Sequence, residues 1–189
     1  MSSANVKNIR VFVVDDHPIV RQGLRMIIEE ENNMDVCGES GNANDAIRLI
    51  SDLEPDIVLV DISLEGTASG IDLVTSLKKR HPSIPALIIS MHDDSLYAER
   101  SIMAGARGYV MKNQVEDVIV TAINTVLEGD LYLKQNTSMK IVSRLLHGSG
   151  EEQQTSVGSL TDREFDIFRL LGQGLGTRKI ANKLNISVN

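Results

Sequence analysis

Four short runs of apolar residues that lack the alternation of a half-exposed strand constrain the fold of this 189-residue chain most strongly. They are VFVV at 11–14, IVLV at 57–60, ALII at 86–89 and, more weakly, YVM at 109–111. Strands of this kind are buried on both faces, which is typical of a parallel sheet covered by helices. A fifth segment, DVCGE at 35–39, is a poorer strand candidate. We therefore expect a parallel sheet of five strands.

Helical patterns fill the gaps between these runs. Pro18 suits the first turn of a helix, while Pro55, Pro82, Gly105 and Gly129 mark helix ends. The apolar positions at helical spacing are Val20, Leu24, Ile27 and Ile28; Ala46, Ile50 and Leu53; Val74 and Leu77; and Val115, Val118, Ile119, Ala122 and Val126. A further helix is expected around Ala98 to Met103. This regular alternation of strand and helix predicts an α/β fold with a doubly wound, five-stranded parallel sheet.

The pattern changes after residue 129, and we predict four segments. They are an α/β domain at 1–129, a connecting helix at 130–147, a linker at 148–159 and a small all-α region at 160–189. The linker is rich in Gly, Ser, Glu and Gln, as flexible connections are.

The region at 160–189 is expected to hold two short helices. Thr161 and Glu164 have the spacing of a capping box, so the first helix should start at residue 162. The segment TRKIANKL at 177–184 predicts the second helix. The residues expected on the inner sides are Ile167, Phe168, Leu170 and Leu171 in the first helix, and Ile180, Ala181 and Leu184 in the second.

Charge is distributed unevenly along the chain, whose net charge is −7. Residues 1–129 carry 11 Lys and Arg against 20 Asp and Glu, whereas residues 130–189 carry 8 against 6. The acidic part should repel nucleic acid and the remainder should not. Because the sequence has neither an apolar run of bilayer length nor a signal-peptide pattern, we expect a cytoplasmic protein with no membrane contact.

Acidic residues follow two of the predicted strands. Asp15 and Asp16 come directly after the first apolar run, and Asp61 follows the run at 57–60. Functional groups of doubly wound sheets gather beyond the carboxyl ends of the strands, so these three carboxylates should meet. Clustered carboxylates need a cation, and hard oxygen ligands select Mg²⁺ or a similar ion.

A hydroxyl and a cation follow two further strands. Ser90 follows the run at 86–89, and Lys112 follows the last run. A carboxylate beside a metal ion, a hydroxyl and an ammonium group is equipped to accept a phosphoryl group. Each feature alone has an ordinary structural explanation, but their position at the ends of several strands favours a phosphoacceptor.

Residues 8–128 resemble the receiver domain of two-component response regulators, through the motifs above and through SMHDD and AGARGYVMK. The segment at 160–187 resembles the helix-turn-helix of the NarL/LuxR/FixJ class. The resemblance implies a flavodoxin-like receiver that binds Mg²⁺ and is phosphorylated on Asp61. The other site residues that it implies are the metal-binding Asp15, Asp16 and Asp61 with the backbone carbonyl of Ser63, the switch residues Ser90 and Tyr109, and the phosphate-pairing Lys112. The loop ISLEGTASG departs from the family because it lacks the usual Pro and is one residue longer.

The resemblance also implies partners: a sensor histidine kinase, a second copy of the chain after phosphorylation, and DNA. The candidate contacts to the DNA backbone are Arg178, Lys179 and Lys183. The helix that reads base pairs would begin near Ser187, so we expect the intact parent protein, rather than the chain as given, to bind DNA specifically.

Two other functions stay open at this point. One is a metal-dependent phosphohydrolase that forms an aspartyl-phosphate, although such enzymes commonly carry Asp-x-Asp after the first strand with the nucleophile there. The other is a receiver that acts only through protein contacts. The preferred hypothesis is a phosphorylation-controlled transcription regulator that is not an enzyme beyond slow self-dephosphorylation.

Overall fold

The computed structural model describes residues 8–64, 68–91, 95–134, 138–139, 160, 162–172, 174–184 and 186. The chain forms two compact units, Met1–Ser143 and Arg144–Asn189. Within the predicted connecting helix, residues 130–134 are not helical and residues 138–139 are helical; the rest of that segment and the whole linker lie outside the described residues. The predicted domain boundaries therefore stay a prediction.

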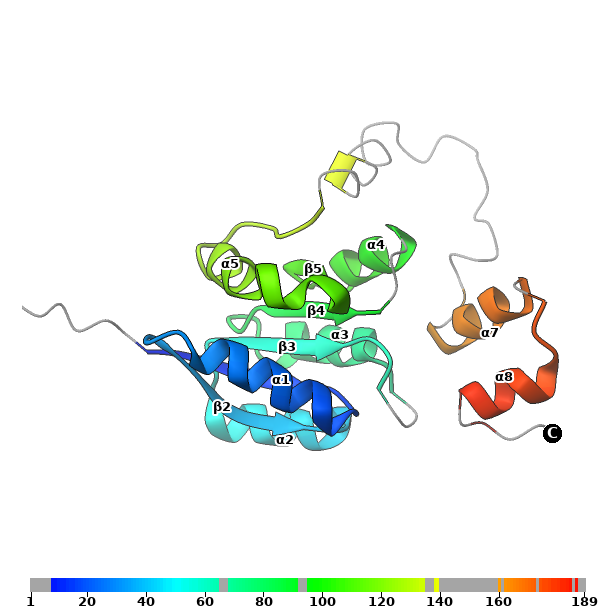
Figure 1. Ribbon diagram of the computed structural model, residues 1–189, viewed down its shortest axis with the longest axis horizontal. Coiled ribbons are helices and arrows are strands. Elements are labelled where there is room, and N and C mark those ends of the chain that lie inside the picture. Colours follow the sequence, from blue (N-terminus) through cyan, green and yellow to red (C-terminus); the bar gives the residue numbers. More distant parts are fainter. Residues whose placement is uncertain are drawn as a thin grey trace, which may run out of the picture. The chain divides into compact units, whose positions relative to one another are not determined.

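The first unit is built on a parallel sheet of five strands in the order β2-β1-β3-β4-β5 (Figure 1). The strands are β1 Ile9–Val14, β2 Met34–Ser40, β3 Ile57–Asp61, β4 Ala86–Ser90 and β5 Gly108–Met111. The helices are α1 Pro18–Glu29, α2 Ala43–Leu53, α3 Gly70–Arg80, α4 Ser95–Ala104 and α5 Val115–Leu127, with a 3₁₀ turn, η1, at Lys112–Gln114. The doubly wound, flavodoxin-like fold predicted from the sequence is confirmed.

Helices cover both faces of the sheet, which explains the continuous apolar runs. The α1 and α5 helices share one face, while α2, α3 and α4 contact one another in turn on the opposite face. All four residues at 11–14 are no more than 1% exposed because side chains of both orientations meet a helix layer. The resulting core is what holds the strand ends in place.

The β2 strand lies at the edge of the sheet, and its sequence is correspondingly less apolar. Four of its seven residues are partly or fully exposed, and the register with β1 shifts between Val11 and Phe12. Gly38 lies at this irregularity, where a Cβ atom would come within 2.7 Å of the Phe12 ring. Close packing therefore accounts for the glycine that weakens the strand pattern.

The ends of the helices follow the local signals in the sequence. His17 precedes α1, and Pro18 lies in the first turn of this helix. The α2 helix ends at Leu53, and the next residue, Glu54, has a φ of 46° that breaks the helix before Pro55. Ser69 and Asp72 form a capping box at the start of α3. The predicted stops at Gly105 and Gly129 coincide with positive φ angles of 118° and 97°.

A short segment after α5 covers the open edge of β5. Tyr132 pairs with Gly108 in a parallel bridge. The Tyr109 amide donates to the Tyr132 carbonyl at 2.9 Å, and the Tyr132 amide donates to the Arg107 carbonyl at 3.0 Å. These bonds satisfy backbone groups that an edge strand would otherwise expose.

The second unit contains α7, Asp162–Gly172, and α8, Thr177–Lys183, so both predicted helices are confirmed (Figure 1). Among the described residues of this unit, the buried apolar ones are Phe165, Leu170, Ile180 and Ala181. The sequence-based inner side of α7 needs correction because Phe168 and Leu171 are 51% and 49% exposed. The seven-residue α8 covers only one side of α7, and Ile167 and Leu184 are half-buried.

Candidate functional site

Two carboxylates and one ammonium group meet at the carboxyl end of the sheet. Asp15 follows β1 and Asp61 ends the neighbouring β3, and the two residues are 1% and 3% exposed. Lys112 follows β5, two strands from β3, and its side chain reaches back to both acids. Its Nζ atom lies 2.6 Å from Asp15 Oδ2 and 2.9 Å from Asp61 Oδ2. The structure thus unites three of the predicted site residues.

The electrostatics of this group are set by burial and by Lys112. Burial raises the pKa of Asp61, while the charge and hydrogen bond of Lys112 oppose that rise. Burial alone would lower the pKa of Lys112, but the nearby Asp61 and Asp15 outweigh it and raise this pKa above its ordinary value. The ammonium group of Lys112 therefore faces two buried carboxyl groups, and this cluster can accept further positive charge.

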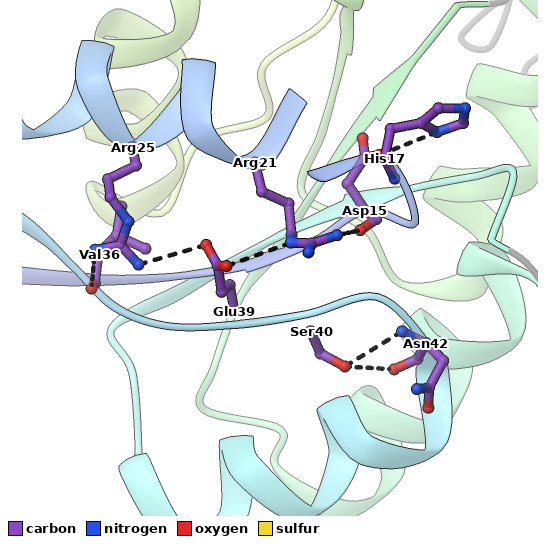
Figure 2. Close-up of polar contacts among 8 residues, drawn as sticks. All are labelled: Asp15, His17, Arg21, Arg25, Val36, Glu39, Ser40 and Asn42. Carbon is purple, nitrogen blue, oxygen red and sulfur yellow. Dashed lines mark hydrogen bonds and ion pairs between the residues drawn. The ribbon is translucent and has the colours of Figure 1, made fainter. Parts of the chain in front are cut away.

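Asp16 and His17 extend the acidic group toward solvent. The Asp16 side chain is 10% exposed, and its Oδ1 lies 2.6 Å from His17 Nδ1. The His17 amide donates to Asp15 Oδ1 at 2.8 Å (Figure 2). Ligand atoms from Asp15, Asp16, His17 and Asp61 all lie within 4.8 Å of one another. The three carboxylates supply the hard oxygen donors that suit Mg²⁺.

The remaining predicted receiver residues occupy the same end of the sheet or lead to it. Ser90 is fully buried at the end of β4, one residue past the partner of Asp61 in the register. Tyr109 is 8% exposed in β5. The side chain of Ser63 is exposed, and its backbone lowers the pKa of Asp61 slightly, against the rise that burial causes.

Gly70 belongs to the site, although the sequence reasoning did not single it out. Its amide donates to the Ile62 carbonyl at 2.9 Å, and a Cβ atom would lie 1.9 Å from the Asp61 carbonyl oxygen. The start of α3 thus packs directly on the backbone of Asp61. The Ser69–Asp72 capping-box pattern could have located the helix start, but no local signal shows the close approach.

Arg21 and Glu39 also lie next to the site and were not anticipated. Arg21 Nη1 donates to the backbone carbonyl of Asp15 at 2.6 Å, and its Nε lies 3.5 Å from Glu39 Oε1 (Figure 2). Neither contact follows from a local motif, because the chain returns through β2 to bring Glu39 beside α1.

The candidate DNA contacts are placed separately in the second unit. Arg178 and Lys179 are exposed on α8. The Lys183 side chain lies outside the described residues. Among the described residues, no helix is long and apolar enough to cross a membrane.

Comparison with known protein families agrees with this arrangement. The family model described as "Response regulator receiver domain" matches residues 11–124, which contain the whole acidic site. A second model, "Bacterial regulatory proteins, luxR family", matches residues 158–189. The chain belongs to the two-component response regulators of the LuxR family. The regulator is thus a phosphorylation-controlled transcription regulator, and the comparisons offer no support for the phosphohydrolase alternative or for a receiver that acts only through protein contacts.

Individual relatives span most of the regulator. It is 28% identical to the oxygen regulatory protein NreC of Staphylococcus carnosus over 182 residues. These residues make up 95% of this chain and 84% of NreC. A LuxR-family response regulator from an Aurantimonas species is 34% identical, with a TM-score of 0.68, and covers 74% of this chain and 99% of that chain. ChrA, a response regulator of a heme-sensing two-component system, is 32% identical, with a TM-score of 0.59, over 95% of this chain and 83% of its own.

Proposed function

We propose that Asp61 of this regulator is the phosphoacceptor and that Asp15, Asp16 and Asp61 hold a Mg²⁺ ion, aided by the backbone carbonyl of Ser63. The observation that carries the proposal is the position of Lys112, whose ammonium group contacts both buried acids at 2.6 and 2.9 Å. A cation held beside a carboxylate is placed to pair with a phosphoryl group that the carboxylate acquires.

The donor is the phosphohistidine of a sensor histidine kinase. An Asp61 carboxylate oxygen attacks phosphorus, a new oxygen–phosphorus bond forms, and the nitrogen–phosphorus bond of the donor breaks with the electron pair passing to the imidazole. Bound Mg²⁺ would neutralise charge on the phosphoryl oxygens. Lys112, whose Nζ lies 2.9 Å from Asp61 Oδ2, neutralises charge on the phosphoryl group as well.

The phosphorylated state is transmitted through Ser90 and Tyr109. Ser90 is a buried hydroxyl beside the site, and Tyr109 lies within β5. The hydroxyl supplies a donor for a phosphoryl oxygen, and Tyr109 follows it inward. A change of this kind alters the surface near β5 and its flanking helices, which we assign to homodimer formation.

The second unit is the DNA-binding part, with Arg178, Lys179 and Lys183 as candidates for phosphate contacts. A solved structure of RcsB, which is 23% identical to this chain, contains two RcsB dimers bound to two DNAs. A dimer on DNA is the corresponding assembly that we propose here, with the protein acting in the cytoplasm.

Labelling by a small phosphodonor tests the phosphoacceptor. Asp61→Asn should abolish labelling by acetyl phosphate with Mg²⁺, because the amide retains the shape of the side chain but lacks the nucleophilic oxygen. Phosphoprotein gels and intact mass would report the product, with Asp56→Asn as a control outside the cluster. Undiminished labelling of the Asp61 variant would overturn the assignment.

Binding of Mg²⁺ to the folded site should raise the stability of the protein. An ion present at ten times its dissociation constant adds about 1.4 kcal/mol, because only the folded state offers the cluster. Asp16→Ala should remove most of this gain, whereas Asp45→Ala on α2 should retain it. Equal melting temperatures in EDTA and in excess Mg²⁺ would argue against a metal site.

A further inference from the structure

The backbone of Asp15 is fixed on both sides by groups outside the acidic cluster. Its amide donates to the carbonyl of Ser40, at the end of β2, at 3.1 Å. Its carbonyl accepts from Arg21 Nη1, on the first turns of α1, at 2.6 Å (Figure 2). Because the peptide between Asp15 and Asp16 is planar, the bond to Arg21 sets the direction in which the chain continues to Asp16.

The guanidinium group of Arg21 is itself held in place. Its side chain is 16% exposed, and its Nε lies 3.5 Å from Glu39 Oε1. Glu39 also contacts Arg25 Nη2 at 3.4 Å, so two arginines on successive turns of α1 share this acid (Figure 2). A planar guanidinium with two partners in different directions has little freedom to turn.

The β2–α2 loop closes the other side of this arrangement. The Ser40 hydroxyl donates to the Asn42 carbonyl at 2.9 Å and accepts from the Asn42 amide at 3.2 Å (Figure 2). A Cβ atom on Gly41 would lie 3.7 Å from Arg21 Nη1, so the loop backbone approaches the guanidinium closely. The Asp15 peptide is thus held between a braced loop and a braced arginine.

We propose that Arg21 is a positioning residue for the divalent-cation site: through the Asp15 carbonyl, it holds the Asp15–Asp16 peptide so that the two carboxylates converge on the ion. The inference rests on the proposed function of the acidic cluster. Groups that orient the ligands of a metal ion commonly change its affinity by 10-fold to 100-fold when they are removed.

The charge of Arg21 acts in the opposite direction from its positioning effect. A positive charge near the cluster repels a divalent cation, although Glu39 partly neutralises it. Loss of Arg21 should therefore tighten cation binding if charge dominates and weaken binding if positioning dominates. The sign of the change separates the two effects.

Arg25 provides a matched control on the same helix. It shares Glu39 with Arg21 and also donates to the Val36 carbonyl at 3.2 Å, but the structure gives it no bond to Asp15. Replacing either arginine removes one charge and one contact with Glu39. Only the replacement of Arg21 removes the bond to the Asp15 backbone.

The experiment measures Mg²⁺ affinity by calorimetric titration of the full chain and of the variants Arg21→Ala, Arg21→Lys and Arg25→Ala. Arg21→Ala should raise the dissociation constant about tenfold. Acetyl phosphate labelling should slow at limiting Mg²⁺ and recover at saturating Mg²⁺. Arg21→Lys retains the charge and one donor, so its affinity should fall between the wild type and Arg21→Ala, and Arg25→Ala should stay within about twofold of the wild type.

Unchanged or tighter Mg²⁺ binding by Arg21→Ala would overturn the inference, as would an equal loss in Arg25→Ala. If circular dichroism shows that Arg21→Ala is unfolded, Arg21→Lys becomes decisive, and wild-type affinity in that folded variant would count against positioning. Failure of the proposed function has a different signature, because the wild type would then bind no Mg²⁺ or Asp61→Asn would still be labelled.

Discussion

The interior of β3 and its last residue are equally buried but differ in what burial does to them. Ile57, Val58, Leu59 and Val60 are fully buried, and Asp61 is 3% exposed. Removing apolar side chains from water stabilises the fold, whereas burial of Asp61 disfavours its charged form and raises its pKa. Lys112 offsets this cost only in part. Stability thus comes from the strand interiors, and the strand ends carry charged groups whose burial opposes it.

Paired substitutions in β3 should separate the two roles. Leu59→Ala removes apolar contacts from the centre of the sheet and should cost about 2 to 5 kcal/mol in the free energy of unfolding. Asp61→Asn, two residues later, should change stability much less, because Lys112 retains Asp15 as its partner and one buried charge is lost. Urea denaturation in EDTA measures both values. A larger loss in Asp61→Asn than in Leu59→Ala would contradict the comparison.

A second pair of substitutions tests the backbone around the site against an open helix surface. Gly70→Ala should destabilise the protein by about 1 to 3 kcal/mol, because its Cβ would lie 1.9 Å from the Asp61 carbonyl oxygen. Gly23→Ala in α1 should stabilise it by about 0.5 to 1 kcal/mol, since nothing lies within 4 Å of the added atom. Thermal melting compares the two variants.

Gly70→Ala should also slow labelling of Asp61 by acetyl phosphate, because α3 must move away from the strand end. Gly23→Ala should be labelled at the wild-type rate. If both variants melt and react alike, the close approach of α3 to Asp61 is unimportant for the site.

The smallest expected effect is a difference in pH dependence between the wild type and Asp61→Asn. Burial raises the pKa of Asp61, so between its ordinary pKa and the raised value the folded state binds more protons than the unfolded state. The stability of the wild type should therefore fall as pH rises through this window, relative to the asparagine variant. Unfolding in EDTA between about pH 4 and pH 7 measures the difference. Parallel curves would show that Asp61 is not penalised by burial.

Most of the secondary structure was predictable because local physics decides it. The runs at 11–14, 57–60 and 86–89 are strands that lie inside the sheet. The α1 helix begins at Pro18, α2 ends just before Glu54, and α4 and α5 end close to glycines with positive φ. The prediction was weakest for β2, which lies at the edge of the sheet and pairs with a neighbouring strand, β1, along one edge only. It failed for the inner side of α7, because the side that α8 covers depends on packing between helices and not on the pattern of one helix.

The sequence by itself determined the fold class, the family and the acidic residues of the site. Asp15, Asp16 and Asp61 follow apolar runs directly, and a parallel sheet brings such strand ends to one edge. Lys112 could be recognised in the same way because it follows β5.

Only the tertiary structure decided which groups hold these residues in place. The bond from Arg21 to the Asp15 carbonyl, the pairing of Arg21 with Glu39 and the approach of Gly70 to Asp61 join segments that are far apart or that meet through backbone atoms. Backbone atoms are the same at every residue, so a contact made to a carbonyl group leaves no mark on the identity of the residue that accepts it. The order of the strands and the packing of the helices create these contacts.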